Sequence, residues 1–457
     1  MGSEDSTELT KLEPHPEVDE PKTPPPPKAK PLLSKSFFLL GMMIGSLTIA
    51  SGLPIALLEC ELHLVELQYE DVCLTIGDEA LGRSRIGLAI DKFTLHFFKT
   101  QLESKPEENV VFSPYSIEQA YFVLITGARG VTLQEMMSAF HLYEKDLGTI
   151  SNEFGKFSGS FTSKGGQGRA LELAYLVAYA KSIKLTPKFV NSTKNLQAEL
   201  LADDFGEPTK VQERINAWVA KKTKNKISKM LSKPPEENAI ALIFNTIYFK
   251  GKWRTYFNAG DTKKKKFTNA DGSTSEIPMM SRKDESNNSL ILPHLWVRED
   301  KFQIIEIPYL DTISMYIFLT DKKNKPQELV SKLDAKKLVS YIESMKPVEM
   351  DYITIPKFKI KQEYELDNIF PKMGIRAAFS ENADFSGICD GKFYLSKSIH
   401  KAVVEIDEKG TVASAGTSGQ INTRQVPIIF NVDHPFMFLI REKNMSITLF
   451  AGIINKL

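Results

Sequence analysis

The segment that most constrains the fold lies near the C-terminus, between two apolar runs rich in β-branched and aromatic residues. Residues 410–419 consist only of Gly, Ala, Ser, Thr and Val, so they have very little apolar area to bury. An acidic turn, DEKG, leads into this segment, and a single arginine, Arg424, lies on its far side. Such a composition is typical of an exposed surface loop. The chain must therefore carry a long exposed loop on a scaffold that has strands on both sides of it.

The order of short motifs around this loop resembles that of the serpin family. In serpins the order HKA, DEKGT, DHPF and LFAG encloses the hinge and the reactive-centre loop, and the same order runs here from His400 to Gly452. Further matching motifs extend the resemblance over Arg85 to Leu457: NVVFSPYSI, GARGVTLQEM, INAWVAKKTKNKI, FNTIYFKGKW, IPKFKI, MGIRAAF and ADFSGI. So many matches in one order make a chance resemblance untenable.

The resemblance implies an α+β serpin fold with large antiparallel β-sheets, about eight or nine helices and an exposed reactive-centre loop at about 410–430. The residue pattern points the same way on its own. Apolar residues recur with helical periodicity over Ile86–Leu102 and Ser116–Ile125. From Ile240 onward, runs such as IALIFNTIYF and ISMYIFLT favour strands. We therefore expect helices packed on the faces of the sheets.

Composition and motifs argue against an enzyme or a nucleic-acid-binding protein. The 457 residues carry a formal net charge of +1, so no global field would attract nucleic acid. The sequence has no G-x-S-x-G, H-E-x-x-H or phosphate-loop motif, and its seven histidines lack metal-ligand spacing. We therefore expect no catalytic activity, no cofactor and no metal, and any chemistry would belong to a partner.

The N-terminal region differs from the rest of the chain. Residues 1–35 are acidic and then rich in Pro and Lys, which predicts a disordered tail. Residues 36–58 carry no charge and are numerous enough to span a bilayer. Because lysines precede this run and glutamates follow it, the tail is expected in the cytosol and the remainder outside. A cleaved signal peptide and a buried core helix are the alternatives.

The expected segments are a tail at 1–35, an apolar signal-anchor or signal segment at 36–59, a linker at 60–84 and a serpin domain at 85–457. The domain would then be secreted, or would form the outer part of a single-pass type II membrane protein. Asn191, Asn287 and Asn444 stand in Asn-x-Ser/Thr sequons, which fits a translocated glycoprotein. Cys60 and Cys73 could pair in an oxidising compartment, with three unpaired thiols as the alternative.

The resemblance also implies the position of the reactive bond. In inhibitory serpins the scissile bond lies fourteen residues after the hinge glycine, and 410 + 14 gives Arg424. The distance back from Pro435-Phe436 gives the same bond, Arg424-Gln425. An arginine suits a protease pocket with an aspartate at its base, as in trypsin-like enzymes.

The hinge before that bond is suited to insertion into a sheet. By resemblance it comprises Glu408, Gly410, Thr411, Val412, Ala413, Ser414 and Ala415. Because a strand alternates its faces, Thr411, Ala413 and Ala415 would share one face, which is small and uncharged. Such a face can be buried without leaving a charge unpaired. Val412, however, replaces the glutamate that is common at this position in the family.

Other residues match the family's conformational machinery. By resemblance, the shutter beneath the opening sheet comprises Ser113, Ser116, Asn245 and His400, the breach contains Trp253, and Lys357 pairs with Glu408 at the hinge. In the stretch Ala174-Tyr175 the family usually has Ala-Asn. The run Lys263–Lys266 is interpreted as a solvated turn in preference to a polyanion site.

The sequence thus predicts a serine protease inhibitor that acts as a suicide substrate. A trypsin-like protease would cleave Arg424-Gln425 and remain bound as a covalent acyl complex to a monomeric inhibitor. The alternative is a non-inhibitory serpin: a carrier, a chaperone or a storage protein. The hinge discriminates between them, because Thr411 and the small residues after it favour insertion, whereas Val412 is less typical.

Overall fold

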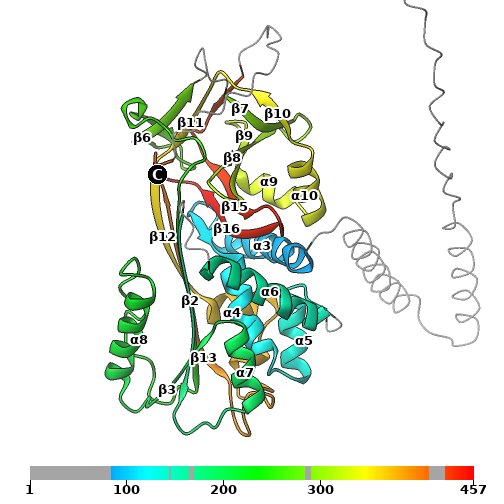
Figure 1. The fold of residues 1–457 in the computed structure, drawn as a ribbon, viewed down its shortest axis with the longest axis vertical. Coiled ribbons are helices and arrows are strands. Elements are labelled where there is room, and N and C mark those ends of the chain that lie inside the picture. The colour runs from blue at the N-terminus through cyan, green and yellow to red at the C-terminus, as the bar shows by residue number, and fades with distance from the viewer. Residues whose placement is uncertain (1–83, 144–145, 164–168, 284–289, 411–427) are drawn as a thin grey trace, which may run out of the picture. The chain divides into compact units, whose positions relative to one another are not determined.

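The computed structural model describes residues 84–143, 146–163, 169–283, 290–410 and 428–457. The chain divides into two units, Met1–Cys73 and Leu74–Leu457, and every described residue belongs to the second. The described residues form nine α-helices and three β-sheets (Figure 1). This arrangement confirms the predicted α+β class and the expected number of helices.

The five-stranded sheet carries the strand that leads into the predicted loop. Its order is β12 (Phe358–Glu365), β13 (Leu395–Ile406), β4 (Ala241–Gly251), β2 (Arg169–Ala180) and β3 (Glu199–Asp203). β13 and β4 run parallel, with His400 directly opposite Asn245. β12 and β2 flank this pair on either side, and both pair antiparallel with it. The end of β13 therefore lies beside the end of β4.

Two further sheets complete the β structure. The seven-stranded sheet is antiparallel throughout, in the order β1 (Val110–Phe112), β16 (Ile447–Ile454), β15 (Phe436–Glu442), β9 (Ile313–Thr320), β8 (Phe302–Pro308), β7 (Ile291–Val297) and β10 (Lys346–Glu349). The four-stranded sheet has the order β14 (Ile429–Asn431), β11 (Tyr352–Pro356), β6 (Thr274–Lys283) and β5 (Lys263–Thr268). β14 is the first strand after the predicted loop, so the loop connects the five-stranded sheet to the four-stranded one.

The helices are α3 (Arg85–Ser104), α4 (Pro114–Ile125), α5 (Gly130–Ala139), α6 (Leu147–Ser163), α7 (Pro187–Asn195), α8 (Pro208–Lys222), α9 (Pro326–Lys332), α10 (Ala335–Glu343) and α11 (Leu366–Ile369). The 3-10 helices are η2 (Ala259–Asp261), η3 (Phe370–Met373) and η4 (Ala377–Phe379). α4 begins where Ser113 caps it: the Ser113 hydroxyl accepts from the Ser116 amide, and Pro114 fills the first helical position.

The five-stranded sheet is covered on both faces. α8 lies alone against one face, and α4 to α7 lie on the other side (Figure 1). The alternation of β4 explains this layering: Leu242 and Phe244 pack with Val211 and Ile215 of α8, whereas Ile243 and the odd-numbered residues after it point into the main core. Asn245 therefore faces α4 and not α8.

Several sequence predictions can be compared with these elements. The two predicted helices correspond to α3 and α4, and the strand-rich C-terminal part is confirmed. The interpretation of Lys263–Lys266 as a turn is wrong, because these residues form most of strand β5. Within the described ranges no helix is long and apolar enough to cross a bilayer. The apolar segment 36–58, the cysteines Cys60 and Cys73, and the remainder of residues 1–83 lie outside the described residues.

Candidate functional site

A buried polar cluster joins β13 to β4. The Nδ1 atom of His400 is hydrogen-bonded to Oδ1 of Asn245, and its Nε2 atom accepts from the Ser113 amide at 3.0 Å. Because Nε2 accepts, the ring proton lies on Nδ1 and is donated to Asn245. Burial lowers the pKa of His400 to about 3, so the ring is neutral at physiological pH. His400 thus links β13 to β4 and to Ser113, the N-cap residue of α4.

Sequence reasoning missed the third residue of this row, Tyr175 on β2. Tyr175 stands directly opposite Asn245, so Tyr175, Asn245 and His400 occupy adjacent positions on three neighbouring strands. Tyr175 is only 5% exposed, and burial raises the pKa of its hydroxyl well above 10. The hydroxyl faces that of Ser116, but neither group makes a hydrogen bond of good geometry within the described structure. The departure from the family's Ala-Asn was the available signal.

Trp253 holds the start of the predicted loop to the end of β4. Its indole is fully buried and stacks on Tyr309, with ring centroids 4.1 Å apart. The indole N–H donates to the carbonyl of Asp407 at 2.7 Å, and the backbone N–H donates to the carbonyl of Lys409 at 2.9 Å. A parallel bridge then pairs Trp253 with Gly410. The structure thus brings the predicted breach residue against the predicted hinge.

Glu408 is held by two side chains, that of Lys357 between β11 and β12 and that of Thr262 directly before β5. Lys357 Nζ lies 2.8 Å from one carboxylate oxygen, and the Thr262 hydroxyl donates to the other at 2.9 Å. Partial burial opposes ionisation, but these hydrogen bonds outweigh it and lower the pKa of Glu408. Lys357 is 43% exposed, so the pair is screened by water and contributes little to stability, about 0–1 kcal/mol.

The reactive part of the predicted site lies beyond the described residues. Thr411, Val412, Ala413, Ser414 and Ala415 of the hinge fall there, and so do Arg424 and Gln425. Of the sequons, Asn191 and Asn444 are exposed and Asn287 lies outside the described residues. Cys389 is buried and not in a disulfide, and burial raises the pKa of its thiol.

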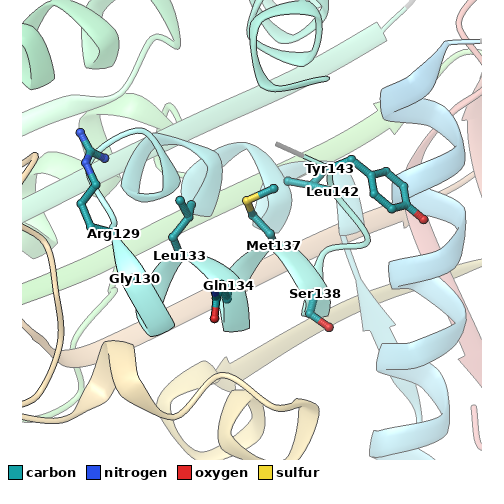
Figure 2. A pocket seen from close by; sticks show the side chains of 8 residues that line it. All are labelled: Arg129, Gly130, Leu133, Gln134, Met137, Ser138, Leu142 and Tyr143. Carbon is teal, nitrogen blue, oxygen red and sulfur yellow. The ribbon is translucent and has the colours of Figure 1, made fainter. Parts of the chain in front are cut away.

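A hollow of about 600 Å³ lies along α5 (Figure 2). Its lining is Arg129, Gly130, Leu133, Gln134, Met137, Ser138, Leu142 and Tyr143. Arg129 is the one charged residue in this lining, and its guanidinium donates to the carbonyl of Ala128 at 2.6 Å. No group of three His, Cys, Asp or Glu side chains in the described part of the chain could hold a metal ion.

The fold and site together define a class of protein: a mixed α+β scaffold in which the segment after β13 connects the five-stranded sheet to β14 of the four-stranded sheet. The family model described as "Serpin (serine protease inhibitor)" matches residues 88–457. The chain belongs to the serpin family, and the resemblance seen in its motifs is confirmed.

Known proteins from several lineages are similar to this chain. Iripin-2 of Ixodes ricinus is 30% identical over 387 residues, which cover 83% of this chain and 95% of the relative. The leukocyte elastase inhibitor of Bos taurus is 32% identical over 380 residues, covering 80% and 98%. The crystal structure of human thyroxine-binding globulin with its hormone has a TM-score of 0.72 at 26% identity, covering 82% and 98%. These similar proteins thus include one named as an elastase inhibitor and one named for binding thyroxine.

Proposed function

We propose that this serpin inhibits trypsin-like serine proteases as a suicide substrate cleaved between Arg424 and Gln425. The observation that carries the proposal is the parallel pair of β13 and β4 directly before the loop. A segment that turns back from the end of β13 would enter between these strands antiparallel to both. One parallel pairing would thereby be exchanged for two antiparallel ones, which are slightly more stable per residue.

The shutter is suited to such an exchange. The side-chain link between β13 and β4 at this level is the hydrogen bond between His400 and Asn245, and both side chains are neutral. Separating the strands at this level therefore exposes no buried charge. Nearer the loop, Lys250 of β4 pairs with Glu405 of β13 and with Asp407, and these partly exposed ion pairs would have to part as well. Insertion of a strand into a sheet of this kind is the known behaviour of inhibitory serpins.

The chemistry would belong to the protease. Its active serine would attack the Arg424 carbonyl, an ester would form between the two proteins, and the new amino terminus at Gln425 would leave. Insertion of the upstream half of the loop would then carry the ester away from the position in which water attacks it. The inhibitor itself supplies the bait and the conformational change.

The direct test is incubation with trypsin followed by denaturing electrophoresis. We expect a covalent complex that survives boiling in SDS, and a released C-terminal fragment whose first residue is Gln425. Trypsin that lacks its active serine is the control and should give neither product. Complete cleavage of the loop without a stable complex would refute inhibition and favour a carrier role.

The carrier alternative has one specific observation in its favour. The fold is shared with a protein named for binding thyroxine, and Val412 is not the usual hinge residue of an inhibitor. The melting temperature after loop cleavage separates the two functions. It should rise strongly if the loop inserts, and it should not change if the loop stays outside the sheet.

We also propose that the serpin domain is a monomer located outside the cell, secreted or anchored by residues 36–58. The uncharged run with lysines on one side supports this location. The exposure of Asn191 and Asn444 is compatible with glycans at both positions. A mobility shift of the expressed protein on glycosidase treatment tests the proposal, and a fully cytosolic protein without a shift would contradict it.

A further inference from the structure

The hollow along α5 has a different chemistry at each of its ends. Figure 2 shows Arg129 at one end and Tyr143 at the other, with Leu133 and Met137 between them. Arg129, Leu133 and Met137 follow one another at intervals of four residues, so they lie on one face of the helix and its cap. The hollow thus has an apolar floor that leads to a guanidinium.

Arg129 uses only part of its capacity to donate hydrogen bonds. Nη1 donates to the carbonyls of Ala128 and Thr126, at 2.6 and 3.3 Å, whereas Nε and Nη2 make no hydrogen bond in the described part of the chain. Hydrogen bonds from Ser386 and, more weakly, the charge of Arg129 lower the pKa of Asp384, but no hydrogen bond joins Arg129 to Asp384 there. The guanidinium therefore keeps donors for a carboxylate bound at this end of the hollow.

The chain enters the described structure beside the other end of the hollow. Ser84 is the first described residue, and the next residue, Arg85, forms an ion pair with Asp146. The amide of Asp146 donates to the carbonyl of Tyr143 at 2.9 Å, and Tyr143 lines the hollow. The residues that precede Ser84 therefore start from the Tyr143 end, opposite to Arg129.

The five residues before Ser84 match the hollow in length and in chemistry. They read EALGR, and they belong to the same unit as α5. Five residues reach at most about 16–18 Å, and a helix with the ten residues of α5 is about 15 Å long. In an extended segment Leu81 and Glu79 would share one face. Leu81 would then lie over the apolar floor, and the carboxylate of Glu79 would reach Arg129.

Two arguments favour this segment over a separate molecule as the occupant. A segment tethered within a few residues of its site has an effective concentration in the millimolar range, which a second copy of the protein or a free peptide does not match. The lining of the hollow consists of eight residues, whereas a stable protein interface has about 20–30 residues on each side. The hollow therefore fits a short attached segment better than the surface of another protein.

We propose that residues 79–83 bind in the hollow along α5, with Leu81 on the apolar floor and Glu79 paired with Arg129. The bound segment would fix the direction in which residues 1–78 leave the serpin domain. This interaction concerns the N-terminal extension and does not depend on the inhibitory function proposed above.

The test replaces Leu81 in the full chain by the photoreactive amino acid p-benzoylphenylalanine. Irradiated benzophenone inserts into nearby C–H bonds and prefers methionine, so Met137 should be the main crosslinked residue. Peptide mass spectrometry of an equal mixture of isotopically light and heavy protein shows whether each link lies within one molecule. We expect links from residue 81 to α5 of the same chain, and none between light and heavy chains.

A charge exchange tests the pairing of Glu79 with Arg129. Arg129→Glu brings like charges together and should lower the yield of the crosslink several-fold, and the addition of Glu79→Arg should restore it. Lys336→Glu on α10 makes the same change of charge at another exposed position, and it should leave the yield unchanged. Thermal melts show which variants are folded, and Arg129→Gln, which should also lower the yield, replaces Arg129→Glu if that variant does not fold.

Three results would overturn the proposal. Crosslinks between light and heavy chains would assign the hollow to a second copy of the protein. Links from residue 81 to several surfaces without a preference for α5 would show that the segment does not bind there. An equal loss of yield in Arg129→Glu and Lys336→Glu would refute the ion pair with Glu79.

Discussion

The row of Tyr175, Asn245 and His400 leads to a testable prediction about the free energy of unfolding. Tyr175→Phe removes a buried hydroxyl that faces Ser116 but makes no hydrogen bond of good geometry in the described structure, while the ring keeps its packing. Tyr115→Phe removes the same atom from an equally buried tyrosine, but there the hydroxyl bonds Ser158 at 2.9 Å. The chemical change is identical in the two variants, and only the hydrogen bonding differs.

The expected effects have opposite signs. A buried hydroxyl without a partner costs about 1–3 kcal/mol, so Tyr175→Phe should raise the free energy of unfolding by about 1 kcal/mol or more. Tyr115→Phe loses one hydrogen bond and should lower that free energy by about 1 kcal/mol. Ser158 keeps its bond from Gln119 at 2.7 Å, so no second orphan arises. The two variants should therefore differ by about 2 kcal/mol.

The measurement is the urea midpoint of the uncleaved protein, with the slope of the transition checked for each variant. A change of midpoint at constant slope reports stability alone. A loss of stability in Tyr175→Phe would show that its hydroxyl is bonded to Ser116 in solution. That result would refute the conclusion that the shutter holds an unsatisfied polar group.

Three further predictions concern charge and the loop. Burial, and then the charge of Asp91, raise the pKa of Glu118 well above 4.5. The native state therefore holds a proton on Glu118 that the unfolded state releases, so stability is lost as pH rises above 4.5. Glu118→Gln should raise the melting temperature most at pH 7 and hardly at all near pH 4. Arg424→Leu should abolish complex formation with trypsin and permit it with a chymotrypsin-like enzyme, so unchanged trypsin inhibition would place the reactive bond elsewhere. Thr411→Arg would require an unpaired guanidinium to enter the sheet, at a cost of several kcal/mol; the variant should fold, be cleaved and release active trypsin, and a wild-type stoichiometry of inhibition would contradict insertion at this hinge.

The fold could be predicted from the sequence because its signals are local and ordered. Helical periodicity predicted α3 and α4, and the apolar runs after Ile240 predicted strands that are present. The prediction of a turn for the basic run was wrong for a physical reason. Four lysines show no alternation of apolar and polar residues, so the periodicity that marks a strand is missing from Lys263–Lys266. Only pairing with β6 shows that this segment is extended.

The candidate site was predictable in its residues but not in its bonding. Motifs identified His400, Asn245 and Ser113, yet the group that Ser113 offers to His400 is a backbone amide, which no side-chain pattern can reveal. Tyr175 was visible only as a departure from the family pattern. Its place beside Asn245 depends on the register of β2 against β4, and that register is set by the whole sheet.

The contacts at the base of the loop also suggest the order in which they would break if the loop inserted into the sheet. Glu408 is held by a half-exposed lysine and a threonine, which together stabilise the hinge by only a small amount. Trp253, in contrast, is fully buried, and it bonds backbone that precedes Gly410. Under the proposed mechanism, the contacts of Glu408 would therefore break while the indole still anchors the end of β13. Lys250 of β4 also pairs with Glu405 of β13 and with Asp407, so these ion pairs would have to part before the strands could separate around the buried hydrogen bond of His400 and Asn245. Because this bond joins neutral groups, the backbone of an inserting strand could replace it, and under the proposed mechanism the shutter would slow insertion without preventing it.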